Sequence, residues 1–171
     1  LTHLAEAPEM GASQLATIII DDFYTSNAPT GYTMAAIDLG KVDMVAETLS
    51  NLAQALVVYA DTDAEAVKVY AGSVMTAVDE AVIHEMHGTR WPDSYGLAIY
   101  LPKIQDGFNP AYNAAAVSLA DDTAWEEFLI GYLTYSSDNW VASARDNTQQ
   151  YYSKEYADLN DFCQELIDSE P

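Results

Sequence analysis

Basic residues are scarce in this chain. Its 171 residues include 6 Lys and Arg against 27 Asp and Glu, which gives a formal net charge of -21 at pH 7. Nucleic acids and anionic membranes attract proteins of the opposite sign, so we expect neither as a partner. Three explanations of the acidity stay open: a partner or substrate rich in Lys and Arg, a halophilic environment in which salt screens self-repulsion, or a solvated surface with no further role.

Other features are missing as well. No run of about 18 apolar residues is present, which argues against a membrane span. The segment Leu1–Met10 lacks a basic start followed by an apolar stretch, so we expect no signal peptide in this chain. Cys163 is the single cysteine, which excludes an internal disulfide. A Gly-rich phosphate loop and a Gly-x-Ser-x-Gly elbow are also absent, so the chain does not resemble a self-sufficient enzyme.

Half of the residues are hydrophobic, and the length suits one domain spanning residues 1–171 with a sizeable core. The segment Tyr95–Pro102 is the expected centre of that core. It is short, rich in large apolar side chains and bounded by prolines, which favours a buried strand over a helix. Helical patterns flank it on both sides. The sequence therefore predicts an α-rich α/β fold, with short central strands around 32–38 and 96–101 packed by five or six helices.

The first half of the chain shows three helical patterns and one further strand. Ser13 is a plausible N-cap for a helix over Ala12–Asn27, with an apolar stripe of Leu15, Ile18, Ile19 and Phe23. Tyr32–Leu39 is the strand candidate, and Asp38 should cap a helix over Leu39–Tyr59 whose buried stripe is Val42, Val45, Leu49, Leu52 and Leu56. A longer helix is expected from about Asp63 to Met86, with the stripe Val67, Tyr70, Val74, Val78 and Val82, before Gly88 ends it.

The second half begins with an expected exposed loop over Lys103–Tyr112. Asp121, Asp122 and Thr123 have the composition of a helix start, and Glu126 stands at capping-box spacing from Thr123. The expected helices are Ala124–Tyr135, which would bury Trp125, Phe128, Leu129 and Leu133; Asn139–Tyr152, after a break at Ser136–Asp138; and Tyr156–Ile167, which would bury Leu159, Phe162, Cys163 and Leu166.

Candidate chemical groups all have ordinary structural interpretations. His84, Glu85 and His87 include sound zinc ligands, but the spacing differs from the helical metalloprotease motif, so a polar helix end is favoured. Cys163 lies among carboxylates on an apolar helix face, which favours a buried structural thiol over a nucleophile. The acidic pairs Asp21-Asp22, Asp121-Asp122 and Glu126-Glu127 suit helix caps and solvated faces better than calcium or glycosidase sites. We assign no catalytic, cofactor-binding or metal-ligating residue.

Several segments resemble the C-terminal part of clostripain-like cysteine peptidases. Tyr95–Pro102 is similar to the Gly-Leu-Ser-Ile-Tyr-Phe-Pro strand of that family, and Ala36–Val42 to its Ala-Ile-Asp-Leu-Ser-Lys segment. The other similar segments are Tyr112-Asn113 with Asp122–Leu129, which match a Tyr-Asn and Trp-x-x-Phe-Leu signature, and Ala144–Gln149 with Tyr156–Phe162, which match an Asp-Leu-Tyr-Asp-Phe helical segment. The resemblance extends over most of the chain from about Gln14 onward.

The resemblance implies a fold related to the caspases, but not an active enzyme. The catalytic His and Cys of the family lie in a domain upstream of these motifs, and nothing here matches them, so His84, His87 and Cys163 cannot stand in for that dyad. The Arg145–Phe162 segment also follows the Tyr95–Pro102 strand here, whereas it precedes that strand in the family. We therefore expect a non-catalytic domain or fragment, inactive on its own, that supports the core and substrate cleft of a secreted peptidase.

The resemblance also implies an upstream catalytic domain or a second copy as partner, basic peptides as substrates, and calcium as the one cofactor worth testing. The main alternative is a stand-alone acidic binding module. In that case Trp91, Trp125 and Trp140 would offer contacts, although core packing is the favoured role for all three. An exposed apolar patch would favour the detached domain. An independent hydrolase would need two carboxylates that converge in a pocket.

Overall fold

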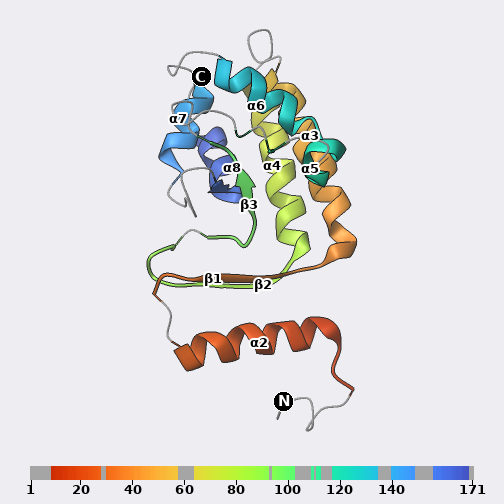
Figure 1. Ribbon diagram of the computed structural model, residues 1–171, viewed down its shortest axis with the longest axis vertical. Coiled ribbons are helices and arrows are strands. Elements are labelled where there is room, and N and C mark those ends of the chain that lie inside the picture. Colours follow the sequence, from red (N-terminus) through yellow and green to blue (C-terminus); the bar gives the residue numbers. More distant parts are fainter. Residues whose placement is uncertain are drawn as a thin grey trace.

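The structure is a computed structural model that describes residues 9–27, 30–57, 64–92, 94–102, 109, 111–112, 117–134, 140–148 and 156–169 (Figure 1). Within these ranges the fold is α-rich with short strands, as the sequence predicts. The elements are α2 (Ala12–Asn27), β1 (Thr33–Ile37), the 3₁₀ turn η1 (Leu39–Lys41), α3 (Val42–Val57), α4 (Ala64–Ala81), β2 (Val82–His87), β3 (Ala98–Tyr100), α5 (Ser118–Asp122), α6 (Trp125–Thr134), α7 (Trp140–Asn147), β4 (Tyr156–Asp158) and α8 (Leu159–Asp168).

Two antiparallel two-stranded sheets organise the described residues. β1 pairs with β2, with Thr33 opposite His87 and Ala35 opposite Glu85, and the register shifts between Ala36 and Ile37. This sheet lies between α2 and the body formed by the other helices (Figure 1). The second sheet pairs β3 with β4 inside that body. The two predicted strands are thus real, but each pairs with a strand that the sequence did not predict.

Alternation along β1 and β2 gives their sheet two different faces. Met34, Ala36, His84 and Met86 share the face toward α2, where His84 Nε2 lies 2.8 Å from Asp21 Oδ1. Ala35 and Glu85 share the opposite face, and Gly96 packs directly against it. A Cβ on Gly96 would lie 2.9 Å from Ala35 Cβ, and the φ of Gly96 is +98°. Gly96 therefore permits both the turn into β3 and the close approach to the sheet.

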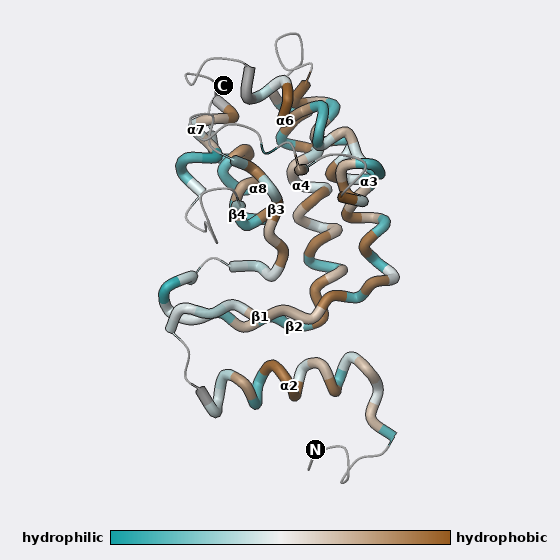
Figure 2. Tube along the Cα trace, in the orientation of Figure 1, coloured by the Kyte–Doolittle hydropathy of each residue, from teal (hydrophilic) through white to brown (hydrophobic). Residues whose placement is uncertain are grey.

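The helical body buries the apolar stripes of α3, α4, α6 and α8. α3 packs against α4 on one side and α6 on the other, and α4 also packs against α8. Figure 2 shows hydrophobic positions recurring along α3 and α4. Val45, Leu49, Leu52 and Leu56 of the predicted α3 stripe are buried, whereas Val42 is 39% exposed in the first turn. Asp38 caps the entry to η1 as predicted, because its Oδ1 accepts the Gly40 N–H at 2.9 Å.

The main correction concerns residues 82–87, which were predicted to continue a helix to Met86. The helix ends at Ala81, and Val82–His87 forms β2. Val82 keeps the four-residue spacing of the preceding stripe, so the periodicity continues past the true end of the helix. His84, Glu85 and His87 consequently alternate across a strand and do not form a polar helix end. Tyr70, placed in the same stripe, is 39% exposed, while Val67, Val74 and Val78 are buried.

Two further corrections fall in the second half of the chain. Residues 156–158, predicted as the first turn of a helix, form β4, and α8 begins at Leu159. Asp121 and Asp122, predicted as a helix start, instead end the five-residue helix α5. Thr123 does serve the start of α6, because its Oγ1 accepts the Trp125 N–H at 3.2 Å. Trp125, Phe128 and Leu129 are buried as predicted.

Smaller differences affect single residues. Ser13 lies inside α2 rather than at its cap, and Ile19 is 55% exposed, because Ile20 and Tyr24 face the sheet instead. Tyr112, expected in an exposed loop, is buried. The predicted helix to Tyr152 ends at Asn147. Residues 58–63, 103–108, 135–139 and 149–155, on which parts of the predicted helices, loop and break fall, and the side chain of Leu133 lie outside the described residues.

We predict that Gly96→Ala destabilises the protein by about 2–4 kcal/mol. The substitution adds a methyl group that overlaps Ala35 and places an L-residue in a left-handed conformation. Gly72→Ala is the matched control, because Gly72 lies inside α4 with open space around its Cα. There alanine should stabilise the helix by about 0.5–1 kcal/mol. Urea unfolding of both variants measures the contrast, and equal stabilities would contradict the packing of Gly96.

Candidate functional site

The segments that resemble the peptidase family meet around β3, except Ala36–Val42, which runs from β1 through η1 to the first residue of α3. β3 pairs with β4, with Ile99 opposite Ala157. The Trp125 Nε1–H donates to the Tyr100 carbonyl at 2.8 Å, and the Arg145 Nε–H donates to the Leu101 carbonyl at 3.3 Å. Segments far apart in the sequence are therefore joined by backbone and side-chain hydrogen bonds around one short strand.

Aromatic packing and a buried carboxylate complete this cluster. Tyr112 stacks on Tyr100 with ring centroids 4.4 Å apart, and Trp125 lies 4.8 Å from Phe128 by the same measure. Asp158 is fully buried. Its Oδ2 accepts the Tyr95 N–H at 2.9 Å, and its Oδ1 accepts two N–H groups in the first turn of α8. These contacts have a structural role, because both carboxylate oxygens of Asp158 accept hydrogen bonds from backbone N–H groups.

The two histidines on β2 serve different neighbours. His84 contacts Asp21 of α2, whereas His87 Nδ1 lies 3.0 Å from Glu85 Oε2 within β2 itself. Across the described ranges, no three His, Cys, Asp or Glu side chains gather closely enough to hold a metal ion. His84, Glu85 and His87 are therefore not brought together as one ligand set.

Cys163 lies fully buried in α8, as predicted. Burial raises the pKa of its thiol far above the ordinary value of 9.0, and the Asp158 carboxylate raises it further. A thiol that keeps its proton and has no contact with solvent is a poor nucleophile. Of the three tryptophans, Trp125 is buried in the core, Trp91 is half-buried with its Nε1 donating to the Gly31 carbonyl at 3.1 Å, and the Trp140 side chain lies outside the described residues.

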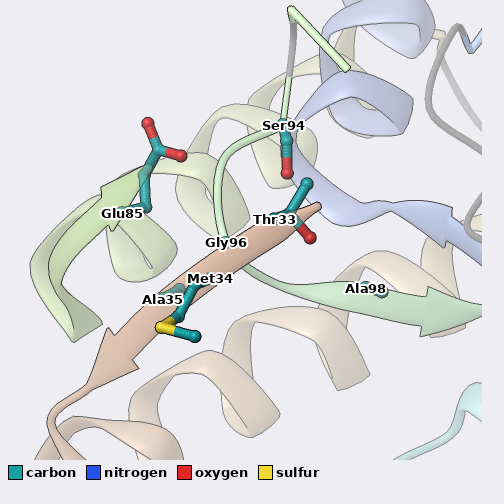
Figure 3. Close-up of a pocket in the computed structure, with 7 residues that line it drawn as sticks. All are labelled: Thr33, Met34, Ala35, Glu85, Ser94, Gly96 and Ala98. Carbon is teal, nitrogen blue, oxygen red and sulfur yellow. The ribbon is translucent and has the colours of Figure 1, made fainter. Parts of the chain in front are cut away.

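A small pocket of about 210 Å³ lies where the 94–98 segment crosses β1 and β2 (Figure 3). Figure 3 shows the side chains of Thr33 and Ser94 on one side of Gly96 and that of Glu85 on the other. Ser94 is buried, and Glu85 already contacts His87. The pocket offers hydroxyls and one carboxylate but no thiol among its lining residues. It can bind small polar groups, and its geometry assigns no reaction.

Two larger hollows follow one face of α3. The first, about 420 Å³, is lined by Asp43, Ala46, Glu47, Ser50, Asn51 and Asp122. The second, about 610 Å³, is lined by Asn51, Gln54, Ala55, Val57, Ala66, Tyr70, Ala124 and Glu127. Asn51 belongs to both, so the two hollows adjoin, and we call them together the α3 groove. The sequence analysis missed this groove; its one signal was the pair of acids four residues apart on α3, which also suits a solvated face.

Comparisons with protein-family models, curated proteins and solved structures found no match. None of the described helices has the length and apolar character needed to cross a membrane.

We predict that Cys163 makes stability depend on pH above about pH 9. The unfolded thiol loses its proton there while the folded thiol keeps it, so the unfolded state binds fewer protons and stability falls as pH rises, by about 1.4 kcal/mol per pH unit. Cys163→Ala should lack this slope. Urea unfolding of both proteins between about pH 8 and pH 10 measures the difference. Tyr112, whose pKa burial raises to about 12, is present in both and cancels. Parallel slopes would contradict the buried thiol.

Proposed function

We propose that this chain is a non-catalytic framework domain of a clostripain-like cysteine peptidase. The observation that supports it best is that the family-like segments other than Ala36–Val42 meet around β3. Trp125, Arg145 and Asp158, each from a different segment, direct their polar groups to the backbone around that strand. If a family needs these residue types for such hydrogen bonds, they form part of its sequence signature although they lie outside its active site. The burial of Cys163 is consistent with a catalytic nucleophile that belongs to another domain.

The sheet of β1 and β2 offers a place for that domain to dock. Among the described residues each strand has one neighbour, so each has an outer edge with backbone groups left for a further strand. Isolated two-stranded sheets are marginally stable. Apolar side chains are exposed around it: Tyr32 before β1, Leu39 after it at 82% exposure, and Ile83 in β2. We infer that the sheet of the upstream catalytic domain continues across one of these edges.

The acidity fits this proposal. Clostripain-like peptidases often cleave after basic residues, and a surface of net charge -21 would concentrate cationic substrates near the cleft. In the parent protein this domain would be secreted and would complete the core beside the catalytic sheet. The assay is therefore run with and without calcium, and the oligomeric state of the chain is measured, because a second copy of the chain is the other expected partner.

The test is reconstitution. The purified chain should not cleave a fluorogenic peptide ending in Arg, and it should give activity when mixed with the upstream segment of its parent gene, with or without calcium. Hydrogen exchange of the same samples should show new protection of amides in either residues 33–37 or residues 82–87, because about half of the N–H groups of an edge strand point outward. Amides in α8, which lies in the body, serve as the internal control.

Each outcome separates the parts of the proposal. Activity in the mixture without protection of β1 or β2 would retain the peptidase assignment and reject docking at the sheet edge. Cleavage by the isolated chain that survives Cys163→Ala would reject a non-catalytic domain. If neither sample cleaves and no upstream segment exists, the stand-alone acidic binding module becomes the better account. The specific observation that favours that second candidate is the α3 groove.

A further inference from the structure

The α3 groove is long, and small residues create it. Its lining residues run along α3 from Asp43 to Val57, which corresponds to about 20 Å of helix. Four alanines lie in its walls and floor: Ala46 and Ala55 on α3, Ala66 on α4 and Ala124 before α6. Larger side chains at these positions would fill the space between neighbouring helices. The length of the groove suits a short extended or helical peptide better than a compact small molecule.

The two ends of the groove differ in chemistry. The end near the start of α3 holds three carboxylates, Asp43, Glu47 and Asp122. The other end holds Val57 and Tyr70, which are 51% and 39% exposed, beside the alanine methyl groups, with Glu127 at its rim. A ligand that satisfies both ends must be cationic along one half and apolar along the other.

Among the described residues, no positive charge balances the acidic end. Every charged residue that the structure places in the lining of the groove is an acid. In the part of the chain that the structure describes, no ion pair involves Asp43, Glu47, Asp122 or Glu127. Lys68 lies on α4 between Ala66 and Tyr70 in sequence, but a two-residue step turns a side chain by about 200° around the helix, away from the groove. Lys41, the other lysine of these helical segments, is bound to Glu80.

We propose that the α3 groove binds a segment of a partner protein that is basic in one half and apolar in the other, about 14 residues long if it is helical. Lys or Arg side chains of that segment face Asp43, Glu47 and Asp122, and an aliphatic or aromatic side chain packs beside Tyr70 and Val57. Charge complementarity sets the direction in which the segment lies and increases its rate of association. This inference is independent of the proposed role in a peptidase, because the groove uses neither β3 nor the β1–β2 sheet.

The probe is a fluorescein-labelled peptide of about 14 residues with Lys and Arg in one half and Leu and Phe in the other. A second peptide of the same composition, with basic and apolar residues interspersed, controls for attraction to the net negative charge. We expect anisotropy titrations to give saturable binding of the first peptide, at least about tenfold tighter than the second, and weaker in about 1 M salt than in about 0.15 M salt.

Two charge-matched double variants locate the site. Asp43→Lys with Glu47→Lys reverses two groove acids, and we expect it to weaken binding at least about tenfold. Glu9→Lys with Asp22→Lys makes the same change in net charge at and before α2, outside the groove, and should alter binding by less than about twofold. All four positions are exposed, so the variants should fold, and circular dichroism checks that they do. Tyr70→Ser, also exposed, should weaken binding while the salt dependence stays the same.

Several results would overturn the proposal. Equal losses in the two double variants would show that the peptide follows net charge rather than the groove. Equal binding of the two peptides would reject the two-ended chemistry, and the absence of saturable binding would reject the site. Competition by spermidine at the same concentration as the peptide would assign the acidic end to small cations instead.

Discussion

The structure depends on the bonding of one short strand that lies inside a helical body. β3 has three residues and, among the described residues, one neighbouring strand, so this pairing can satisfy only a few of the backbone polar groups in the segment around it. Side chains from distant segments complete the set: Trp125 for the Tyr100 carbonyl, Arg145 for the Leu101 carbonyl and Asp158 for the Tyr95 N–H. An unsatisfied buried carbonyl or N–H would cost about 1–3 kcal/mol, so these partners determine how the later helices pack.

The same requirement removes one of the few positive charges from the surface. Arg145 is 1% exposed and is held by the Leu101 carbonyl and by Asp146 at 2.9 Å. Arg90 lies over the Trp91 ring, and Lys41 is paired with Glu80. Among the described residues that line the α3 groove every charged side chain is an acid, so these acids keep a net negative field. The preference of the α3 groove for cations follows from the acidic residues that line it. Its shape follows from the alanines that lie where the helices meet.

Sequence periodicity predicted what depends on local pattern. The α8 stripe, the α3 stripe apart from the exposed Val42, the described part of the α6 stripe and the cap at Asp38 follow from spacing and side-chain chemistry, and the structure confirms them. β2 was missed because Val82 extends the helical spacing of α4, whereas its strand identity comes from pairing with β1, some fifty residues earlier. β4 was missed because three residues give too short a pattern, and only β3 makes them a strand. The α3 groove could not be predicted for a similar reason: Ala55, Ala66 and Ala124 are far apart in the sequence and come together only in the folded chain.

Helix α2 is attached to the rest of the molecule mainly through one face of the β1–β2 sheet. Its principal contacts are with β1 and β2, and among its described side chains only Ile20 and Tyr24 are buried. The polar contacts that hold it to the sheet include the Tyr24 hydroxyl, which donates to the Tyr32 carbonyl, and Asp21, which contacts His84. Little apolar area is therefore exposed when α2 leaves the sheet, compared with unfolding of the body. We therefore expect α2 to detach from the sheet at a lower free-energy cost than global unfolding, which would expose one face of β1 and β2 while β3 and the helices around it stay folded.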